Sequence, residues 1–448
     1  MKEGEIMKIC RLLLHSFLVI ILTASANAFL WVKAEPRILF LLIPAVTAVH
    51  LVAGAFFQNI PKKRLRVCNH GAALLIVFLL SAGISVIFHT MLAFRLIPND
   101  IGTWIWSAVF CIAMEAAVFW HGIICVYLTS AQLGIRYRVL GIVCGPIPIA
   151  QLIALGKILS VVYKEIRFES EKELLNEKRK EAKICQTKYP LLLVHGVFFR
   201  DSKLLNYWGR IPKELEKNGA QIYYGNHESA ASVAKSAEEL SARIKQIVSE
   251  TGCGKLNVIA HSKGGLDMRY ALSELGIAPY VASLTTVNTP HRGCLFVDTL
   301  LARAPDSLAE RVANTYNASF LLLGDEHPDF MEAVNDLSAS ACQKRNAVLK
   351  TPSGIYYQSI GSVLSRASGG RFPLNVSYHL AQYFEGANDG LVSEDSFAFG
   401  EHYTLLRAKG KRGISHGDMI DLNRENLEGF DVREFYVQCI AQLKQKGL

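Results

Sequence analysis

The stretch that decides the fold is Leu256-Asn257-Val258-Ile259-Ala260-His261-Ser262-Lys263-Gly264. Its mostly apolar first part, Leu256–Ala260, predicts a buried strand. After Ser262 the apolar residues recur at helical spacing, at Met268, Ala271, Leu272 and Leu275. A serine flanked by small residues between a strand and a helix is typical of a nucleophile elbow, whose sharp turn presents the hydroxyl. The sequence therefore predicts Ser262 as a nucleophile.

A second pentapeptide, Gly413-Ile414-Ser415-His416-Gly417, fits the same pattern of small residue, any residue, serine, any residue, glycine. At an average glycine usage of about 7%, a chain of this length yields roughly 0.3 chance matches. The pentapeptide alone is therefore weak. Ser415 follows the polar run Arg407–Gly413 and has no strand directly before it. Context therefore favours Ser262 over Ser415.

Two later residues are candidates for the acid and the base that a nucleophilic serine needs. In elbow-type enzymes the chain order is serine, acid, histidine. Asp389 lies in a polar turn before an apolar step and is the predicted acid, which would orient an imidazole. His416 is the predicted general base. The alternatives are a turn aspartate in an Asp-Gly pair and an ordinary buried or surface histidine; order and context favour the catalytic interpretation.

The first apolar run, Tyr189–Val194, ends in His195-Gly196-Val197. An acyl-transfer enzyme needs hydrogen-bond donors for the developing oxyanion. The backbone N–H groups of Val197 and of Lys263, which follows the nucleophile, are the predicted donors. The alternative is an ordinary strand end with a turn glycine.

Residues 185–448 are long enough to form one domain with its own core. Apolar runs alternate with helical patterns, which predicts an α/β fold with a mainly parallel sheet. A helix is expected over Ser232–Thr251. The expected strands are Tyr189–Val194, Ala220–Tyr224, Lys255–Ala260, Val281–Asn288 and Gly354–Gly361.

The N-terminal third has a different character. The chain of 448 residues is 51% hydrophobic and 19% charged, with a mean hydropathy of +0.23, which excludes a disordered chain. The apolar excess lies before residue 165. Crossing a bilayer takes about 20 apolar residues. The qualifying stretches are 9–32, 38–57, 71–94 and 102–129, with a weaker fifth at 139–162.

These stretches predict an all-α transmembrane region of four or five helices over residues 1–163, although the first also resembles a signal peptide. Glu115 lies inside a predicted span, where we expect a neutral carboxyl hydrogen-bonded within the bundle. Residues 164–184 carry many charges of both signs and are expected to form a solvated helical linker.

Loop charges indicate the orientation. The basic loops at 62–66 and 136–138 are expected in the cytoplasm. If the fifth span crosses, residues 185–448 lie outside the cytoplasm, which is the orientation we expect for a multi-pass protein of the cell membrane. The net charge of +9 is spread over loops and a mixed-sign linker, so contact with anionic lipid is favoured over nucleic acid.

Seven segments between residues 187 and 425 resemble bacterial triacylglycerol lipases of the Pseudomonas and Burkholderia type, and clostridial relatives that carry AHSKGG. In order they are LLLVHGVFFRD, VIAHSKGGLDMRYA, NTPHRG, DLSASACQKRN, YYQSIGS, ANDGLVS and ISHGD. The resemblance implies an α/β-hydrolase fold and hydrolysis of carboxylic esters. It implies that Ser262, Asp389 and His416 form the catalytic triad and that Val197 and Lys263 form the oxyanion hole. It also implies a mobile helical lid at about 294–330.

The resemblance does not decide whether this chain binds a structural calcium ion. Asp418 matches one of the two aspartates that often bind it in this family, but Ser368-Gly369-Gly370 stands where the other is expected. No cofactor is expected to be required, because no phosphate-binding glycine motif stands between a strand and a helix.

The sequence thus predicts a membrane-anchored serine hydrolase acting on lipid or other acyl esters. The alternatives are an acyltransferase or a phospholipase with the same triad, and a membrane sensor whose domain only binds.

Overall fold

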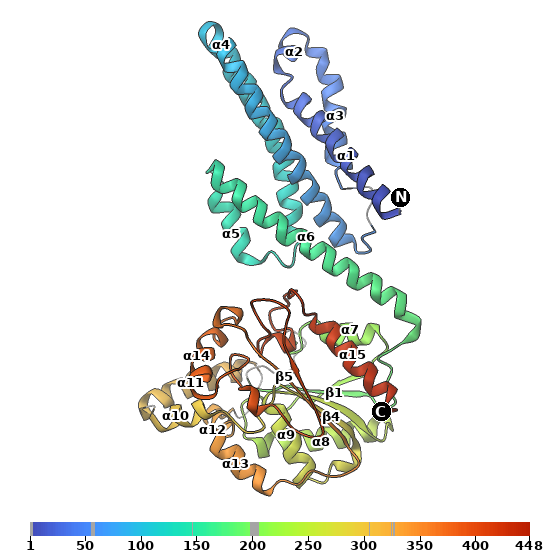
Figure 1. Cartoon of the computed structure of the whole chain (residues 1–448), viewed down its shortest axis with the longest axis vertical. Coiled ribbons are helices and arrows are strands. Elements are labelled where there is room, and N and C mark those ends of the chain that lie inside the picture. The colour runs from blue at the N-terminus through green and yellow to red at the C-terminus, as the bar shows by residue number, and fades with distance from the viewer. Residues whose placement is uncertain are drawn as a thin grey trace. The chain divides into compact units, whose positions relative to one another are not determined.

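The computed structural model describes residues 3–54, 59–145, 147–197, 206–303, 305–323, 325 and 328–448. The chain divides into two compact units, Met1–Glu177 and Lys178–Leu448, which are described one at a time. The predicted break at residue 163 falls inside one continuous helix, α6 (Pro148–Arg179), which begins in the weak fifth apolar stretch and runs through most of the charged linker (Figure 1).

The second unit is built on a six-stranded sheet in which every pairing is parallel, in the order β2-β1-β3-β4-β5-β6. The strands are β1 (Leu191–Val194), β2 (Ile222–Tyr224), β3 (Leu256–His261), β4 (Val281–Val287), β5 (Tyr356–Ser362) and β6 (His402–Leu406). The predicted α/β fold with a parallel sheet is confirmed. Val194 pairs with Ala260 and His261 pairs with Val287, so the carboxyl ends of β1, β3 and β4 lie at one edge.

Helices cover both faces of this sheet. Leu191 and Leu193 of β1 face a core shared with α7 (Ile211–Lys217) and α15 (Val432–Gln445). The alternate residues of β1 face a second core, shared with α8 (Val233–Thr251) and α9 (Lys263–Glu274). This alternation is the period of two that a strand imposes on its side chains. Three further helices of this unit are α12 (Phe330–Asn335), α13 (Ala339–Val348) and α14 (Leu374–Glu385).

Two further helices, α10 (Leu295–Arg303) and α11 (Asp306–Leu323), occupy the predicted lid region and project from the side of the unit (Figure 1). Residues 304, 324, 326 and 327 of that region lie outside the described residues. Leu295, Leu300 and Leu321 are each about half exposed, at 49%, 49% and 55%. Apolar side chains therefore remain open to solvent here, and the role of a lid stays a prediction.

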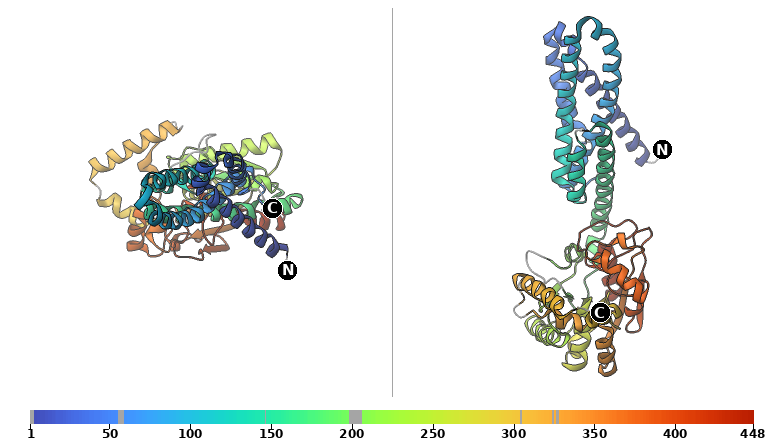
Figure 2. Two further views of the ribbon diagram at one scale, coloured as in Figure 1. Left: turned by 90° about the horizontal axis from the view of Figure 1, so that it is seen from above. Right: turned by 90° about the vertical axis from the view of Figure 1, so that its left-hand side faces the viewer.

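The first unit is helical. It contains α1 (Glu3–Ala26), α2 (Phe29–Ala34), α3 (Leu39–Val52), α4 (Lys63–Thr129), α5 (Gly134–Cys144) and the start of α6. The long helix α4 contains Asp100 with non-helical angles (φ −153°, ψ 72°), and there the chain folds back into a hairpin of two arms (Figure 2). The indole N–H of Trp104 donates to the carbonyl of His89 across the hairpin at 3.2 Å.

Among the described residues, two helices are long and apolar enough to cross a membrane, α1 near the N-terminus and α4. The predicted span 9–32 is interrupted between α1 and α2, and 38–57 contains only the 14-residue helix α3, with residues 55–57 outside the described part. The spans 71–94 and 102–129 lie in the two arms of α4. The weak stretch 139–162 is divided between α5 and α6. A multi-span bundle therefore remains a prediction.

The expectation of a fully solvated linker is wrong at its start. Glu165 of α6 is 1% exposed, and its carboxylate accepts from the guanidinium of Arg64 and the hydroxyl of Ser130 at 2.7 and 2.6 Å. The backbone N–H groups of Ala131 and Gln132 donate to it as well. A carboxylate with four donors fixes the turn after α4, so this charged residue is structural.

Candidate active site

Ser262 lies between β3 and α9 with φ 56° and ψ −131°, a backbone conformation that side-chain-bearing residues rarely adopt. The flanking glycines explain how the chain fits this turn. A Cβ at Gly264 would overlap the carbonyl oxygen of His195, and one at Gly265 would overlap the side chain of Thr289. Strand and helix approach too closely here for side chains, which is the geometry that the pentapeptide predicts.

His416 and Asp389 form a close pair. The Nδ1 atom of His416 lies 2.6 Å from Oδ2 of Asp389, and the backbone N–H of His416 donates to the carbonyl of Asp389 at 2.9 Å. Asp389 is fully buried, and its Oδ1 accepts the N–H groups of Leu391 and Val392 at 2.9 and 2.7 Å. These donors, within the Asp-Gly turn, satisfy the buried carboxylate oxygen and fix the orientation of the side chain.

A third partner of Asp389 is Asn288, at the end of β4, whose amide donates to Oδ2 at 2.6 Å and to Ser362 Oγ at 2.8 Å. The sequence reasoning missed this residue, although it opens the NTPHRG segment. Asn288 has a positive φ of 47°, a backbone conformation that asparagine adopts more often than most other residues do. A polar residue directly after an apolar strand was the available signal.

The histidine of the pair lies beside the elbow. The ring of His416 is 4.5 Å, centroid to centroid, from that of His261, the residue directly before Ser262. Ser262, His416 and Asp389 are all buried, at 6%, 8% and 0% exposure. The structure thus brings the three predicted residues into one region at the carboxyl end of the sheet.

His261 is a second imidazole in this region, but its surroundings keep it neutral. Burial, and then the neighbouring His416, lower the pKa of His261 well below its usual range. Its Nδ1 lies 2.7 Å from the hydroxyl of Tyr207. Because this imidazole is so weakly basic, it does not compete with His416 for the proton of the serine.

The predicted oxyanion donors approach the elbow from two sides. Lys263 is the first residue of α9, so its backbone N–H is among those that a helix leaves without an intrahelical acceptor. Val197 is buried against Ala230 and Phe330. A Cβ at the adjacent Gly196 would lie 2.8 Å from Cβ of Ser262, so this loop lies directly on the elbow. Residues 198–205, which follow, lie outside the described residues.

The side chain of Lys263 extends away into the core, a role that the sequence did not indicate. Its Nζ donates to Asp267 Oδ1 and to Ser236 Oγ, both at 2.9 Å, and both Lys263 and Asp267 are about 1% exposed. Burial raises the pKa of Asp267 to about 7, although Lys263 acts to lower it. This pair anchors the first turn of α9, and with it the backbone of residue 263.

The residues around Asp418 do not fit a calcium site. Both carboxylate oxygens of Asp418 are bound by the guanidinium of Arg412, at 2.8 and 3.2 Å. A Cβ at Gly369, where the second aspartate is expected, would overlap the carbonyl oxygen of Arg412. The part of the chain that the structure describes contains no group of three or more His, Cys, Asp and Glu residues that could hold a metal ion.

The parallel sheet and the strained serine between strand and helix define the class of protein, an α/β protein of the hydrolase type. No family model matches the chain. Its sequence is similar to a triacylglycerol lipase of Vibrio cholerae, at 29% identity over 290 residues, covering 59% of this chain and 90% of that protein. It is 35% identical over 263 residues to triacylglycerol lipase 2 of Saccharomyces cerevisiae, covering 54% and 74%. The chain therefore belongs to the triacylglycerol lipase family.

Other similarities cover fewer residues or have lower sequence identity. A triacylglycerol lipase of Pseudarthrobacter phenanthrenivorans is 35% identical over 158 residues, and this chain spans about half of that relative's length, 49%. Among solved structures, the Staphylococcus hyicus lipase is 18% identical with a TM-score of 0.46, covering 58% of this chain and 97% of that one. EstA from Clostridium botulinum is 17% identical with a TM-score of 0.43, covering 58% and 88%. The family membership makes this chain a carboxylic ester hydrolase and sets aside the non-catalytic sensor.

Proposed function

We propose that this protein is a membrane-anchored serine hydrolase that cleaves the carboxylic esters of lipids with Ser262, His416 and Asp389. The observation that carries the proposal is the 2.6 Å pair of His416 and Asp389 beside the strained turn at Ser262. The lipase relatives support a lipid ester as substrate.

In the proposed reaction, Ser262 Oγ attacks the ester carbonyl carbon while Nε2 of His416 takes the hydroxyl proton. Asp389 holds the Nδ1–H of His416, which fixes the tautomer that leaves Nε2 free, and stabilises the imidazolium that forms. The oxyanion accepts hydrogen bonds from the backbone N–H groups of Val197 and Lys263.

The tetrahedral intermediate then collapses. The carbon–oxygen bond to the alcohol breaks, and the alcohol leaves with the proton that His416 returns. Water attacks the acyl-enzyme in the same way, with His416 as the base, and releases the carboxylic acid and free Ser262. An acyltransferase would differ only in this second half, where an alcohol replaces water.

The first experiment is hydrolysis of p-nitrophenyl esters, from butyrate to palmitate, by the full chain. Removing a triad serine costs on the order of 10⁶ in kcat, so Ser262→Ala is expected to abolish turnover. The matched control is Ser415→Ala, in the competing pentapeptide, which is expected to retain most of the activity. Equal activity of wild type and Ser262→Ala would refute the proposed nucleophile. Faster turnover with added alcohol acceptors than with water would favour the acyltransferase alternative.

We further propose that the chain is a multi-pass protein of the cell membrane in which a fifth span within 139–162 crosses, so that the hydrolase unit is extracytoplasmic. Each arm of α4 exceeds the length of about 20 residues that a crossing takes, and α1 meets the same requirement. Basic residues at 62–66 and 136–138 flank these helices, which favours cytoplasmic loops there. A cytoplasm-only reporter fused after Tyr163 is expected to be inactive. Its activity would reverse the orientation.

A further inference from the structure

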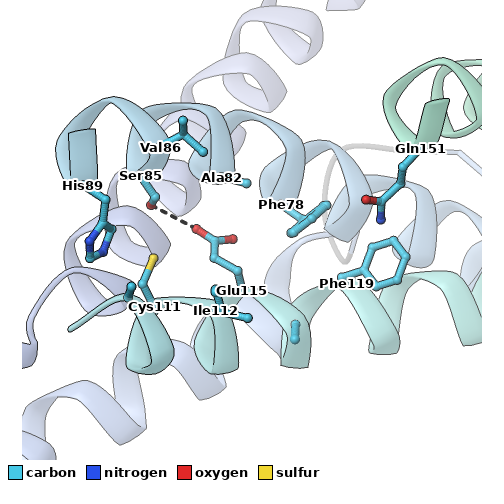
Figure 3. Close-up of a pocket in the computed structure, with 12 residues that line it drawn as sticks. Phe78, Ala82, Ser85, Val86, His89, Cys111, Ile112, Glu115, Phe119 and Gln151 are labelled. Carbon is cyan, nitrogen blue, oxygen red and sulfur yellow. Dashed lines mark hydrogen bonds between the residues drawn. The ribbon is translucent and has the colours of Figure 1, made fainter. Parts of the chain in front are cut away.

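The helical unit contains a cavity that the proposed reaction does not use. It measures about 400 Å³, within the range of about 300–1,000 Å³ that small-molecule sites occupy. The cavity lies between the two arms of α4, with Gln151 of α6 at one end (Figure 3). Its walls are mostly apolar: Phe78, Ala82, Val86, Ala108, Ile112, Ala116 and Phe119.

One carboxyl group lies within this apolar space. Glu115 is 5% exposed, and its Oε1 accepts from the hydroxyls of Ser81 at 2.5 Å and Ser85 at 3.3 Å. Those serines are held in turn from the α1 side, because Thr23 Oγ1 donates to Ser81 Oγ at 3.0 Å and Asn27 Nδ2 donates to Ser85 Oγ at 2.8 Å. The position of the carboxyl group is therefore fixed by two helices.

The second carboxyl oxygen, Oε2 of Glu115, is buried and has no hydrogen-bond partner. The expected hydrogen bonding of this glutamate within the bundle is made by Oε1 alone. Both ring nitrogens of His89, which also lines the cavity, are buried without partners. Buried polar atoms of native proteins are nearly always paired, so unpaired ones that face a cavity point to a ligand. Figure 3 shows the Glu115 carboxyl group between the two arms.

The cavity can be reached from the side of the hairpin. Val86 and Ile112, one on each arm, are 66% and 67% exposed, so they form an outer rim where an apolar chain can enter. Phe78 and Phe119 form a tilted ring pair further along, with centroids 5.1 Å apart. A ligand with one apolar chain and a small polar head matches this arrangement.

From this geometry we propose that the cavity binds a neutral single-chain lipid alcohol, with its hydroxyl donating to Oε2 of Glu115 and its chain leaving between Val86 and Ile112. A hydroxyl supplies the missing donor without adding a charge. A carboxylate or an ammonium head would carry a charge that has to be desolvated among apolar walls. The site lies in the first unit, so this proposal does not depend on the proposed triad.

The test is photolabelling of the full chain carrying Ser262→Ala, in phosphatidylcholine vesicles, with a hexadecanol that bears a diazirine in its chain. The Ser262→Ala background removes the proposed acyl-enzyme, so labelling and hydrolysis report separately. We expect labelled peptides from both arms of α4, and at least tenfold better competition by hexadecanol than by palmitate or hexadecylamine.

Variants distinguish labelling inside the cavity from labelling on the outer surface of the helices. Glu115→Leu removes the acceptor, and Ala82→Phe fills the cavity while keeping Glu115; each is expected to reduce labelling at least tenfold. Glu115→Gln keeps a polar partner and is expected to stay within about threefold of wild type. Asp100→Asn, a carboxylate at the exposed turn of α4, is the control and should change nothing.

Other results would overturn the proposal. Labelling spread along α1 and α4 and insensitive to both Glu115→Leu and Ala82→Phe would mean that the cavity is not a site. Better competition by hexadecylamine, together with loss on Glu115→Gln, would assign the site to a cation. Better competition by palmitate would assign it to a carboxylic acid. Each variant must have the helical content of the wild type by circular dichroism and must elute from size-exclusion chromatography at the same volume.

Discussion

Asn288 shows how a residue outside the predicted triad can set its geometry. Its amide donates to the same oxygen of Asp389 that faces His416, and its second donor contact, to Ser362, fixes the plane of the amide. The carboxylate therefore cannot rotate away from the imidazole without losing two hydrogen bonds. Both side-chain hydrogen bonds of Asn288 go to Asp389 and Ser362, so it acts on the triad through Asp389, as a positioning residue.

Replacing Asn288 by alanine is expected to lower kcat about tenfold, because a charge-assisted hydrogen bond contributes about 1.5–3 kcal/mol and only part of it orients His416. KM for p-nitrophenyl butyrate should stay within twofold. Asp389→Asn removes the acceptor itself and should cost on the order of 10⁴ in kcat. If Asn288→Ala changed KM alone, the residue would contact substrate instead of positioning Asp389.

Arg412 binds both carboxylate oxygens of Asp418 in the loop that carries His416. The carboxylate is 4% exposed and also accepts the backbone N–H of Ser415 at 2.8 Å. Close by, Arg210 binds Asp421 through Nε at 2.7 Å and through its own backbone N–H at 2.8 Å. Two arginine–carboxylate pairs thus hold the segment on which the predicted base lies.

Chelation of calcium with excess EGTA is therefore expected to leave both esterase activity and the thermal midpoint unchanged. Arg412→Ala leaves Asp418 buried without its cation, which costs about 3 kcal/mol and should lower the midpoint by several degrees. Arg407→Ala, which breaks an exposed pair with Glu394, is the matched control and should have little effect. Inactivation by EGTA that calcium reverses would show that a metal binds after all.

At the scale of elements, the contact of β3 with α9 depends on glycine. A methyl group at Gly264 has no space, since the carbonyl of His195 and the side chain of Val194 occupy it. Gly264→Ala is expected to destabilise the hydrolase unit by about 2 kcal/mol or more and to abolish turnover. Gly156→Ala, in α6 with open space around it, is the control and should be neutral or slightly stabilising. Normal activity of Gly264→Ala would mean that the elbow is looser than described.

The sequence predicts five of the six strands, including the edge strand β2, and misses the other edge strand, β6. β1, β3 and β4 are buried along their whole length; β1 is apolar throughout, and β3 and β4 are rich in apolar and β-branched residues, so all three stand out from their surroundings. β6 lies at the edge of the sheet, and three of its five residues, His402–Thr404, are exposed. Its mixed composition resembles a loop, and only its pairing with β5 makes it a strand.

The burial of charged residues was not predictable from the sequence. The elbow and the order of Ser262, Asp389 and His416 follow from local patterns, because each occupies a turn with its own signature. Asp267 under Lys263 and Glu165 over the turn at Ser130 look like surface charges in sequence, and only packing places them inside. The same holds for Arg412, whose partner is decided by how the loop folds.

At the scale of the hydrolase unit, several buried imidazoles make stability depend on pH. Burial lowers the pKa of His195 to about 4 and the pKa values of His261 and His291 well below the usual range. In the unfolded chain these histidines take up protons near pH 6.5. Below that pH the unfolded state binds more protons than the folded state, so stability falls as the pH falls. The buried carboxyl of Asp267, with a raised pKa, contributes with the opposite sign, but it is one group against three.

The free energy of unfolding of the hydrolase unit is therefore expected to fall from pH 6.5 to pH 4.5, by up to about 1.4 kcal/mol per pH unit for each histidine. The thermal midpoint of the hydrolase transition, measured on the detergent-solubilised full chain, should drop steadily over the same range. His291→Gln should lower the level of stability, because the contact with Thr286 is lost, yet make the slope against pH shallower. His402→Gln, at an exposed strand position, is the control and should leave the slope as it is. A slope that His291→Gln leaves unchanged would contradict this assignment and would locate the acid sensitivity in groups other than His291.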